Sequence, residues 1–348
     1  MPTPVLAKNA ADSPPLFPPK ALPEITPRPR TLPPCVDSLP VQSFHRGALH
    51  PISKGAADHA KIWIETVEGR TSPGYDIPAD RLRRKIGNSE LSVCLRVLAH
   101  RTGEIAHIAR ASGFDALYVD MEHSAISPHQ VAEICSVALA MHFPALVRVP
   151  EEASSLATIL LDAGAAGIIL PHIENAESAR KAVAACKFPP LGARSISGAA
   201  IHLHYADTPL EQMIDALNRA AFLAVMLESR VALANADAIA QVEGPELLLV
   251  GTSDLCIEMG IPGQHGHPAI EEAYRHVAKV CKAHGKAFGI AGIGDRNLIA
   301  KYAALGATFV SAGSDHAMLL DAARQRVKVL RDVVAPSSNG TQPGHAAG

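Results

Sequence analysis

The chain has 348 residues, of which 48% are hydrophobic and 19% charged, and its formal net charge is −2. This length can bury a large core, and the near-neutral charge argues against a nucleic-acid-binding protein, which usually carries a basic stripe. No apolar run approaches the roughly 18 residues that span a bilayer, which argues against a membrane protein. The six cysteines are scattered without a CxxC pair, as is typical of reduced thiols in an intracellular protein. A soluble, cytoplasmic α/β enzyme is therefore expected.

Both ends of the chain differ in composition from its middle. The first 40 residues hold 12 of the 27 prolines, and proline fixes φ and removes an amide donor. Residues 1–77 are therefore predicted to be a largely disordered leader. Its excess of basic residues is compatible with an organellar transit peptide, which stays an alternative. Residues 335–348 are predicted to be a flexible tail, which places the folded domain at 78–334.

Between these ends, short apolar runs alternate with segments of helical periodicity. Runs that are apolar on both faces are typical of strands buried in a parallel sheet. Eight strands are predicted, at Leu91–Val97, Ala116–Val119, Ala145–Val149, Gly167–Leu170, Phe222–Leu227, Leu247–Val250, Ala287–Ile290 and Thr308–Ser311. Several of the helical segments end at a glycine that suits a C-cap, and Ser127 followed by Pro128 predicts a helix start.

Eight strands alternating with helices over about 250 residues predict a (β/α)8 TIM barrel. The alternative is a doubly wound open sheet, which usually has a glycine-rich phosphate loop near its start, and the sequence contains no GxGxxG or Walker motif. The segment Pro78–Lys85 is predicted to be a helix that caps the base of the barrel, with Pro78 in its first turn.

The active site of such a barrel lies at the carboxyl ends of the strands. Polar residues gather at these ends: Asp120, Glu122, His123, Arg148, His172, Glu174, Glu228 and Asp254. Glu228 and Asp254 follow neighbouring strands and could supply two carboxylate oxygens to Mg²⁺ or Mn²⁺, although either could instead cap a helix or form a salt bridge.

Two further residues at these strand ends suggest chemistry. His123 is a candidate general base, or alternatively a rim histidine that bonds to Asp120. Arg148 lies in the apolar run LVRVP, where an unpaired guanidinium would be costly. It must therefore meet an anion, which could be Asp120, Glu122, or a substrate carboxylate or enolate.

Six segments, in this order, resemble the HpcH/HpaI aldolase family: YVDMEH (118–123), VRVP (147–150), LLDAGAAGIILPHIE (160–174), LGARS (191–195), MLES (226–229) and VGTSDL (250–255). The resemblance extends from near Pro78 to near Val334, and the PHIE and ES endings look closer to the macrophomate synthase branch. It implies that Glu228 and Asp254 bind a divalent metal (Mg²⁺, Mn²⁺ or Co²⁺). It also implies that Arg148 contacts the keto or enolate oxygen of a pyruvate-like substrate, that His123 is the catalytic histidine and pairs with Asp162, and that Asp120 orients the site.

The activity implied by this resemblance is that of a metal-dependent carbon–carbon lyase. Such an aldolase cleaves or forms 4-hydroxy-2-oxo acids through a metal-bound pyruvate enolate, and oxaloacetate decarboxylation is a related reaction. The family also implies a homo-oligomer, a hexamer by analogy, with a small 2-oxo acid as substrate. Two alternatives stay open: a CoA-ester lyase of the citrate lyase β or malyl-CoA type, and a non-catalytic barrel that serves as a pathway partner.

Two positions depart from the family pattern. Met226 stands where the family usually has glutamine, and on a strand it would face the same side as Glu228. Thr252 and Ser253 replace the usual Pro-Ala or Pro-Gly before Asp254. Met226, Ser253 and the amides near Asp254 are therefore expected to line the substrate pocket.

Overall fold

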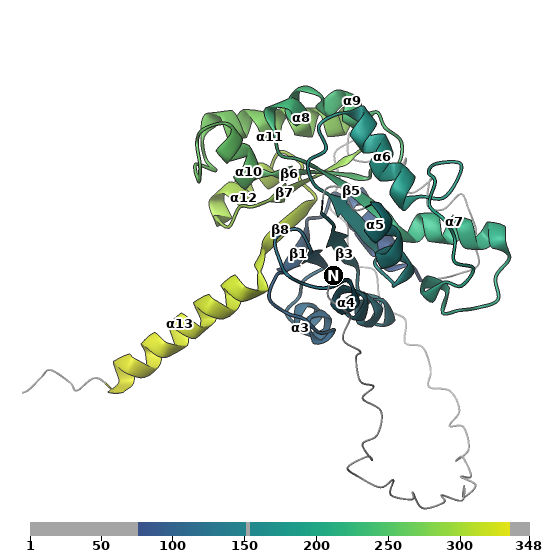
Figure 1. Ribbon diagram of the computed structural model, residues 1–348. Coiled ribbons are helices and arrows are strands. Elements are labelled where there is room, and N and C mark those ends of the chain that lie inside the picture. The colour runs from purple at the N-terminus through teal and green to yellow at the C-terminus, as the bar shows by residue number, and fades with distance from the viewer. Residues whose placement is uncertain (1–75, 151–153, 335–348) are drawn as a thin grey trace, which may run out of the picture. The chain divides into compact units, whose positions relative to one another are not determined.

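The computed structural model describes residues 76–150 and 154–334, and within them eight parallel strands close into a barrel (Figure 1). The strands are β1 (Ser92–Val97), β2 (Ala116–Asp120), β3 (Ala145–Arg148), β4 (Gly167–Leu170), β5 (Phe222–Leu227), β6 (Leu247–Gly251), β7 (Ala287–Ala291) and β8 (Phe309–Ser314). Each strand pairs with the next, and β8 pairs with β1. The predicted (β/α)8 barrel is confirmed, and β8 extends three residues beyond its predicted end.

Helices alternate with these strands, as the sequence periodicity predicts. They are α2 (Pro78–Gly87), α3 (Glu104–Ala111), α4 (Pro128–Ala140), α5 (Ser154–Asp162), α6 (Ala176–Cys186), α7 (Leu210–Ala220), α8 (Arg230–Ala234), α9 (Ala236–Ala240), α10 (Thr252–Glu258), α11 (Pro268–Ala283), α12 (Arg296–Ala303) and α13 (Asp315–Val334), with a short 3-10 helix η1 at Ile201–Leu203. The predicted leader lies outside the described residues up to position 75, as does the tail from position 335. Ile77, at the end of the predicted leader, is buried in the barrel interior.

Local sequence signals set the ends of these helices. Ser127 caps α4 in a reciprocal capping box with Gln130, and Pro128 occupies the first helical turn, where its missing amide donor costs nothing. The glycines that follow the helical segments adopt positive φ, for example 86° at Gly113 and 104° at Gly164. Because a side chain is strained in that conformation, glycine ends these helices cleanly.

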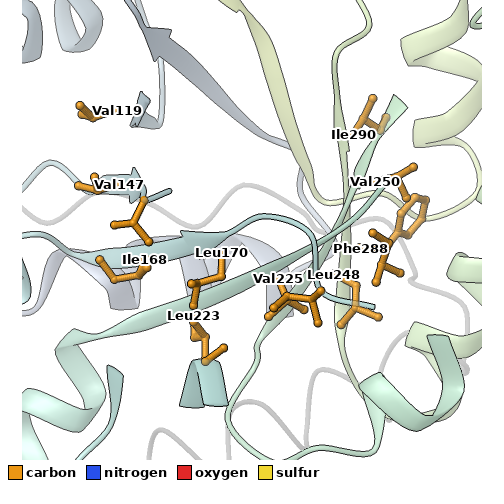
Figure 2. Close-up of a cluster of buried hydrophobic side chains, with 14 of the residues drawn as sticks. Val119, Val147, Ile168, Leu170, Leu223, Val225, Leu248, Val250, Phe288 and Ile290 are labelled. Atoms are coloured by element: carbon orange, nitrogen blue, oxygen red, sulfur yellow. The ribbon is translucent and has the colours of Figure 1, made fainter. Parts of the chain in front are cut away.

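Successive residues of each strand point alternately outward and inward. The outward residues pack against the helices, among them Val119, Val147, Ile168, Leu223, Val225 and Leu248 (Figure 2). The inward residues fill the barrel, among them Cys94, Tyr118, Leu146, Met226, Leu249 and Phe309. In β1, Leu95 and Val97 belong to the outer layer, so Arg96 shares the inward face with Cys94.

Helix α2 closes the base of the barrel, as predicted. Leu82 and Ile86 join the interior cluster. Arg83 makes a two-pronged ion pair with Glu246, at 2.6 and 2.8 Å, and bonds to Asp80 at 2.8 Å. Glu246 immediately precedes β6, so this network lies at the amino ends of the strands. The opposite mouth is left for the site.

Helix α13 extends away from the barrel (Figure 1). Its residues from Met318 to Val333 are all exposed, including Leu319 at 72% and Val333 at 77%. Within the described ranges, no helix combines the length and the apolar character that crossing a membrane requires.

Candidate active site

Charged side chains from four different strands meet at the carboxyl-end mouth of the barrel. Asp120 and Arg148 are the last residues of β2 and β3, and Glu228 follows β5. Arg96, from β1, joins them through Asp120. Because parallel strands all end at the same mouth, residues far apart in the chain become neighbours here.

Asp120 is at the centre of this cluster and is fully buried. Its carboxylate accepts hydrogen bonds from Nε and Nη2 of Arg148, at 3.0 and 2.6 Å, and from Nε of Arg96 at 2.7 Å. The backbone amides of Glu122 and His123 also donate to it, at 3.1 and 3.3 Å. Burial alone would raise the pKa of Asp120, but its bonds to Arg148 and Arg96 outweigh that effect and lower it. Asp120 is therefore ionised.

Arg148 is only 3% exposed, and carboxylates surround it. Nη1, the nitrogen not bonded to Asp120, lies 2.7 Å from Oε2 of Glu122. That contact lacks hydrogen-bond alignment, since Oε2 is a buried atom without a hydrogen-bond partner. Burial opposes the charge of Arg148, but the bond to Asp120 and nearby negative groups raise its pKa. It is therefore a permanent cation at the mouth.

Glu228 lies on the other side of the mouth and is 4% exposed. Its Oε2 accepts a hydrogen bond from the backbone amide of His172 at 3.0 Å, whereas its Oε1 is buried without a hydrogen-bond partner. Burial, and to a smaller extent the charge of Asp254, raise the pKa of Glu228. Asp254 lies in the first turn of α10. Glu228 and Asp254 both follow the carboxyl ends of neighbouring strands, β5 and β6, and their joint role stays a prediction.

His172 and Gly251 hold Glu228 in place. The His172 ring bridges the two sides of the mouth: Nε2 lies 2.9 Å from Oε1 of Glu122, and Nδ1 lies 3.3 Å from Oε2 of Glu228. A Cβ atom at Gly251 would lie 2.3 Å from Oε1 of Glu228, so only glycine leaves room for this carboxylate. The glycine of the VGTSDL segment is thus required by close approach.

These residues fit a divalent cation. An unpartnered buried carboxylate oxygen is costly unless something positive meets it, and a second carboxylate beside it adds to that cost. Among residues 76–150 and 154–334, no three or more His, Cys, Asp or Glu side chains form a complete ligand set. Two carboxylates that leave the remaining positions to water and substrate suit Mg²⁺ or Mn²⁺ better than a zinc cage.

Comparisons with known proteins identify the family. The family model described as HpcH/HpaI aldolase/citrate lyase matches residues 98–322. The chain is 36% identical over 242 residues to the 4-hydroxy-4-methyl-2-oxoglutarate aldolase tasA of Hapsidospora irregularis, a match that covers 68% of this chain and 90% of that protein. This chain belongs to the HpcH/HpaI aldolase/citrate lyase family. The predicted family and enzyme class, an aldehyde-lyase, are confirmed.

Solved structures agree with the fold. An HpcH/HpaI aldolase from Desulfitobacterium hafniense DCB-2 superposes with a TM-score of 0.69 at 27% identity, covering 74% of this chain and 99% of that chain. Macrophomate synthase superposes with a TM-score of 0.62 at 21% identity, covering 74% and 91%. At that identity the likeness concerns the fold alone, so the assignment to the macrophomate synthase branch stays a prediction.

Met226, the departure from the family's usual glutamine, lies inside this HpcH/HpaI site. It is 2% exposed, and its sulfur lies 3.7 Å from the Tyr118 hydroxyl and 3.9 Å from Nη1 of Arg148. A thioether is a weak acceptor. Both donors are therefore held less firmly than an amide oxygen would hold them.

His123 lies at the mouth with its side chain 52% exposed, and its Nε2 is 3.8 Å from Oε2 of Glu122. Its expected partner, Asp162, lies elsewhere. Asp162 is the last residue of α5 and bonds to Nη2 of Arg194 at 2.5 Å. Because α5 runs from the carboxyl ends of the strands back to their amino ends, its last residue is at the far end of the barrel. The predicted His123–Asp162 pair therefore does not form within one chain.

Ser253 lies in the first turn of α10, where its side chain is exposed and its hydroxyl donates to the Gly292 carbonyl at 3.4 Å. Ser253 therefore lies at the amino end of α10, next to Asp254 in the chain. Its predicted contact with a substrate carboxylate stays a prediction.

Two members of the cluster received no role from the sequence. His172 stood among the polar strand ends, but its bridging position depends on the tertiary structure. Arg96 was missed, although the signal was the one that singled out Arg148: an arginine inside an apolar strand. Its alternation with Leu95 and Val97 would have placed it inside the barrel.

Proposed function

We propose that this protein is a divalent-metal-dependent aldolase that cleaves and forms 4-hydroxy-2-oxo acids, with pyruvate as one product of cleavage. The observation that carries the proposal is the buried, unpartnered Oε1 of Glu228 beside Asp254, with the Arg148 cation at the same mouth. The name of the tasA relative, a 4-hydroxy-4-methyl-2-oxoglutarate aldolase, supports this substrate class.

Glu228 and Asp254 would hold the cation, which would polarise the C2 keto oxygen of the substrate and fix its orientation. The protein's own part is to hold the Glu228 carboxylate in place at the mouth. Gly251 gives Glu228 its room, and the backbone amide of His172 orients the carboxylate.

Arg148 would stabilise the charge that develops during cleavage. The C3–C4 bond breaks, the 4-hydroxyl gives up its proton to become an aldehyde or ketone, and the electron pair moves onto the three-carbon fragment as an enolate. Its negative charge lies on the C2 oxygen. Nη1 of Arg148 is the nitrogen not bonded to Asp120. Among the described residues, it donates only to the weak acceptor sulfur of Met226 and contacts Oε2 of Glu122 without hydrogen-bond alignment, so it is the donor that would turn to the C2 oxygen. Donors fixed before the reaction contribute strongly to catalysis, because they need not reorganise as charge appears.

His123 would take the proton of the 4-hydroxyl in cleavage, and a proton from this histidine or from solvent would then add to C3 of the enolate to give pyruvate. In the condensation direction His123 would return the proton to the new 4-hydroxyl. Its exposed ring at the mouth is accessible to substrate, and a histidine near neutrality can both accept and give a proton. Oε2 of Glu122 lies 3.8 Å from Nε2 of His123.

The test is cleavage of 4-hydroxy-2-oxoglutarate, followed as released pyruvate, with and without Mg²⁺, Mn²⁺ or Co²⁺. Glu228→Gln should lower turnover at least ~100-fold and abolish Mn²⁺ binding in calorimetry. Glu258→Gln is the matched control. Glu258 is the last residue of α10, at the opposite end of that helix from Asp254, and it pairs with Arg230 at the surface. Metal-independent turnover, or a fully active Glu228→Gln variant, would contradict the proposal. Turnover confined to acyl-CoA substrates would favour the CoA-ester lyase instead.

We also propose that the protein is a homo-oligomer. The support is α13, which presents Leu319, Leu330 and Val333 to solvent with exposures of 72%, 52% and 77%, because apolar residues gathered on one exposed element commonly mark a protein interface. Analytical ultracentrifugation tests this, and a monomer at micromolar concentration would contradict it. The expectation of a hexamer is the more specific outcome of the same measurement.

A further inference from the structure

Arg96 is a second guanidinium at the mouth of the barrel, and the proposed chemistry does not use it. Its side chain points inward, as Cys94 does. The pairing of β1 with β8 is irregular immediately before it: Cys94 pairs with Ser311 and Arg96 with Ser314, so three steps of β8 match two of β1. Such irregularities often re-aim a side chain beside an active site.

Arg96 and Arg148 share one carboxylate but differ in how fully they are engaged. Arg148 binds both oxygens of Asp120, Oδ1 through Nε and Oδ2 through Nη2, and its side chain is 3% exposed. Arg96 binds only Oδ2 of Asp120, through Nε and Nη2, and its side chain is 25% exposed. Among the described residues, no hydrogen bond joins Nη1 of Arg96 to a protein acceptor. The side chain of Arg96 is thus partly accessible to solvent at the carboxyl end of β1.

Arg96 shares its counterion with a second arginine. The single negative charge of Asp120 is shared between two arginines, and the second carboxylate of this side, Glu122, lies against Arg148. A partly exposed guanidinium is suited to a carboxylate, which it can bind with directional hydrogen bonds.

The strand order shows which part of a substrate would reach Arg96. In a closed ring of eight strands, β1 lies opposite β5, and β3 lies midway between them. With C1 and C2 of the substrate held near Glu228 after β5, and the C2 oxygen at Arg148 on β3, the chain beyond C3 extends toward β1. Carbon 5, on the half that leaves as the acceptor, would then come nearest to Arg96.

We propose that Arg96 binds a carboxylate on the acceptor half of the substrate, so that the preferred substrates are 4-hydroxy-2-oxo dicarboxylic acids. This inference rests on the proposed aldolase function for the orientation of the substrate. Asp120 holds both arginines, and each would bind a different part of the substrate: Arg148 the developing enolate, and Arg96 the distal carboxylate.

The test compares two substrates that differ only at C5, 4-hydroxy-2-oxoglutarate with a carboxylate and 4-hydroxy-2-oxopentanoate with a methyl group. The wild type should prefer the dicarboxylate. In Arg96→Gln, the ratio of the two kcat/KM values should fall about 10- to 100-fold, mainly through KM, because a charge-assisted bond to one substrate is lost. Arg96→Lys keeps the charge and should retain part of the preference. Arg110→Gln is the control, because Arg110 is an exposed arginine that bonds to the Met141 carbonyl.

Binding without turnover separates this inference from the proposed function. Calorimetry with Mn²⁺ present would compare 2-oxoglutarate with 2-oxopentanoate, two probes that lack the reactive 4-hydroxyl. A wild-type preference for 2-oxoglutarate that Arg96→Gln removes would support the role of Arg96 even if no aldol cleavage were found. Equal affinity of the wild type for both probes would overturn it. So would an unchanged substrate ratio in Arg96→Gln with lower turnover on both substrates, because Arg96 would then act only through Asp120.

Discussion

The two ends of the barrel carry networks of charged residues, and the two networks differ in completeness. At the base, Arg83 donates to Glu246, Asp80 and the Arg219 carbonyl, and Lys187 donates to the Asn218 carbonyl. At the mouth, Oε1 of Glu228 is buried without a hydrogen-bond partner, and the Arg96 side chain is 25% exposed. A completed network stabilises the closed end of the fold, whereas an incomplete one retains the capacity to bind.

This contrast predicts that the base can be damaged without changing the chemistry. Glu246→Gln would leave Arg83 without its two-pronged partner, and removing one member of a buried ion pair costs roughly 3 kcal/mol of folding free energy. Urea unfolding should show that loss, while kcat/KM per folded molecule stays at the wild-type value. A stable variant with impaired turnover would mean that the two ends are coupled.

At the mouth, a substitution should instead reduce turnover and change stability less. Arg148→Lys keeps a positive charge but cannot reproduce the two parallel bonds to Asp120 and a third donor toward the substrate. Turnover should fall about 100-fold, mainly in kcat, with a smaller change in thermal stability. Steady-state kinetics with saturating Mn²⁺ measure this. A change in KM alone would assign Arg148 to ground-state binding instead.

The pH dependence of stability should also distinguish the two ends. Although burial opposes it, Arg83 and Lys187 lower the pKa of Glu246 below its usual 4.5. An acid with a lowered pKa in the folded state stabilises the protein above its unfolded pKa, and this contribution is lost as pH falls through the folded pKa. The stability gap between wild type and Glu246→Gln should therefore be largest near pH 6 and narrow below about pH 4.5. It should also decrease toward pH 8, because burial lowers the pKa of the neighbouring Lys187 to about 8 and its charge is lost there. Urea unfolding across that range measures the gap, and a gap that widens in acid would contradict this account.

The smallest effect is expected at Met226. An amide oxygen in Met226→Gln would accept stronger hydrogen bonds from Tyr118 and Arg148 than the sulfur does. Holding Arg148 more firmly should tighten pyruvate binding by about 2- to 10-fold, as calorimetry with Mn²⁺ can show. Weaker binding would mean that the surrounding side chains have adapted to the thioether.

The sequence by itself determined the barrel, its strands and the mouth at which the site lies. Apolar runs buried on both faces, and glycines that end helices, are local patterns whose physical causes act within a few residues. Together they placed all eight strands to within three residues at either end. The same patterns placed Glu228, Asp254, Arg148 and His123 at one mouth, because strand ends in a parallel barrel must converge.

Only the tertiary structure decided which side chains pair. Strand alternation could have indicated that Arg96 points into the barrel. That Arg96 shares Asp120 with Arg148, however, depends on the closure of β1 against β8 and on their irregular register. The separation of Asp162 from His123 depends on the direction in which α5 runs, and the bridging position of His172 depends on the positions of Glu122 and Glu228. Pairing between distant elements is set by the packing of the whole chain, and local sequence carries little information about it.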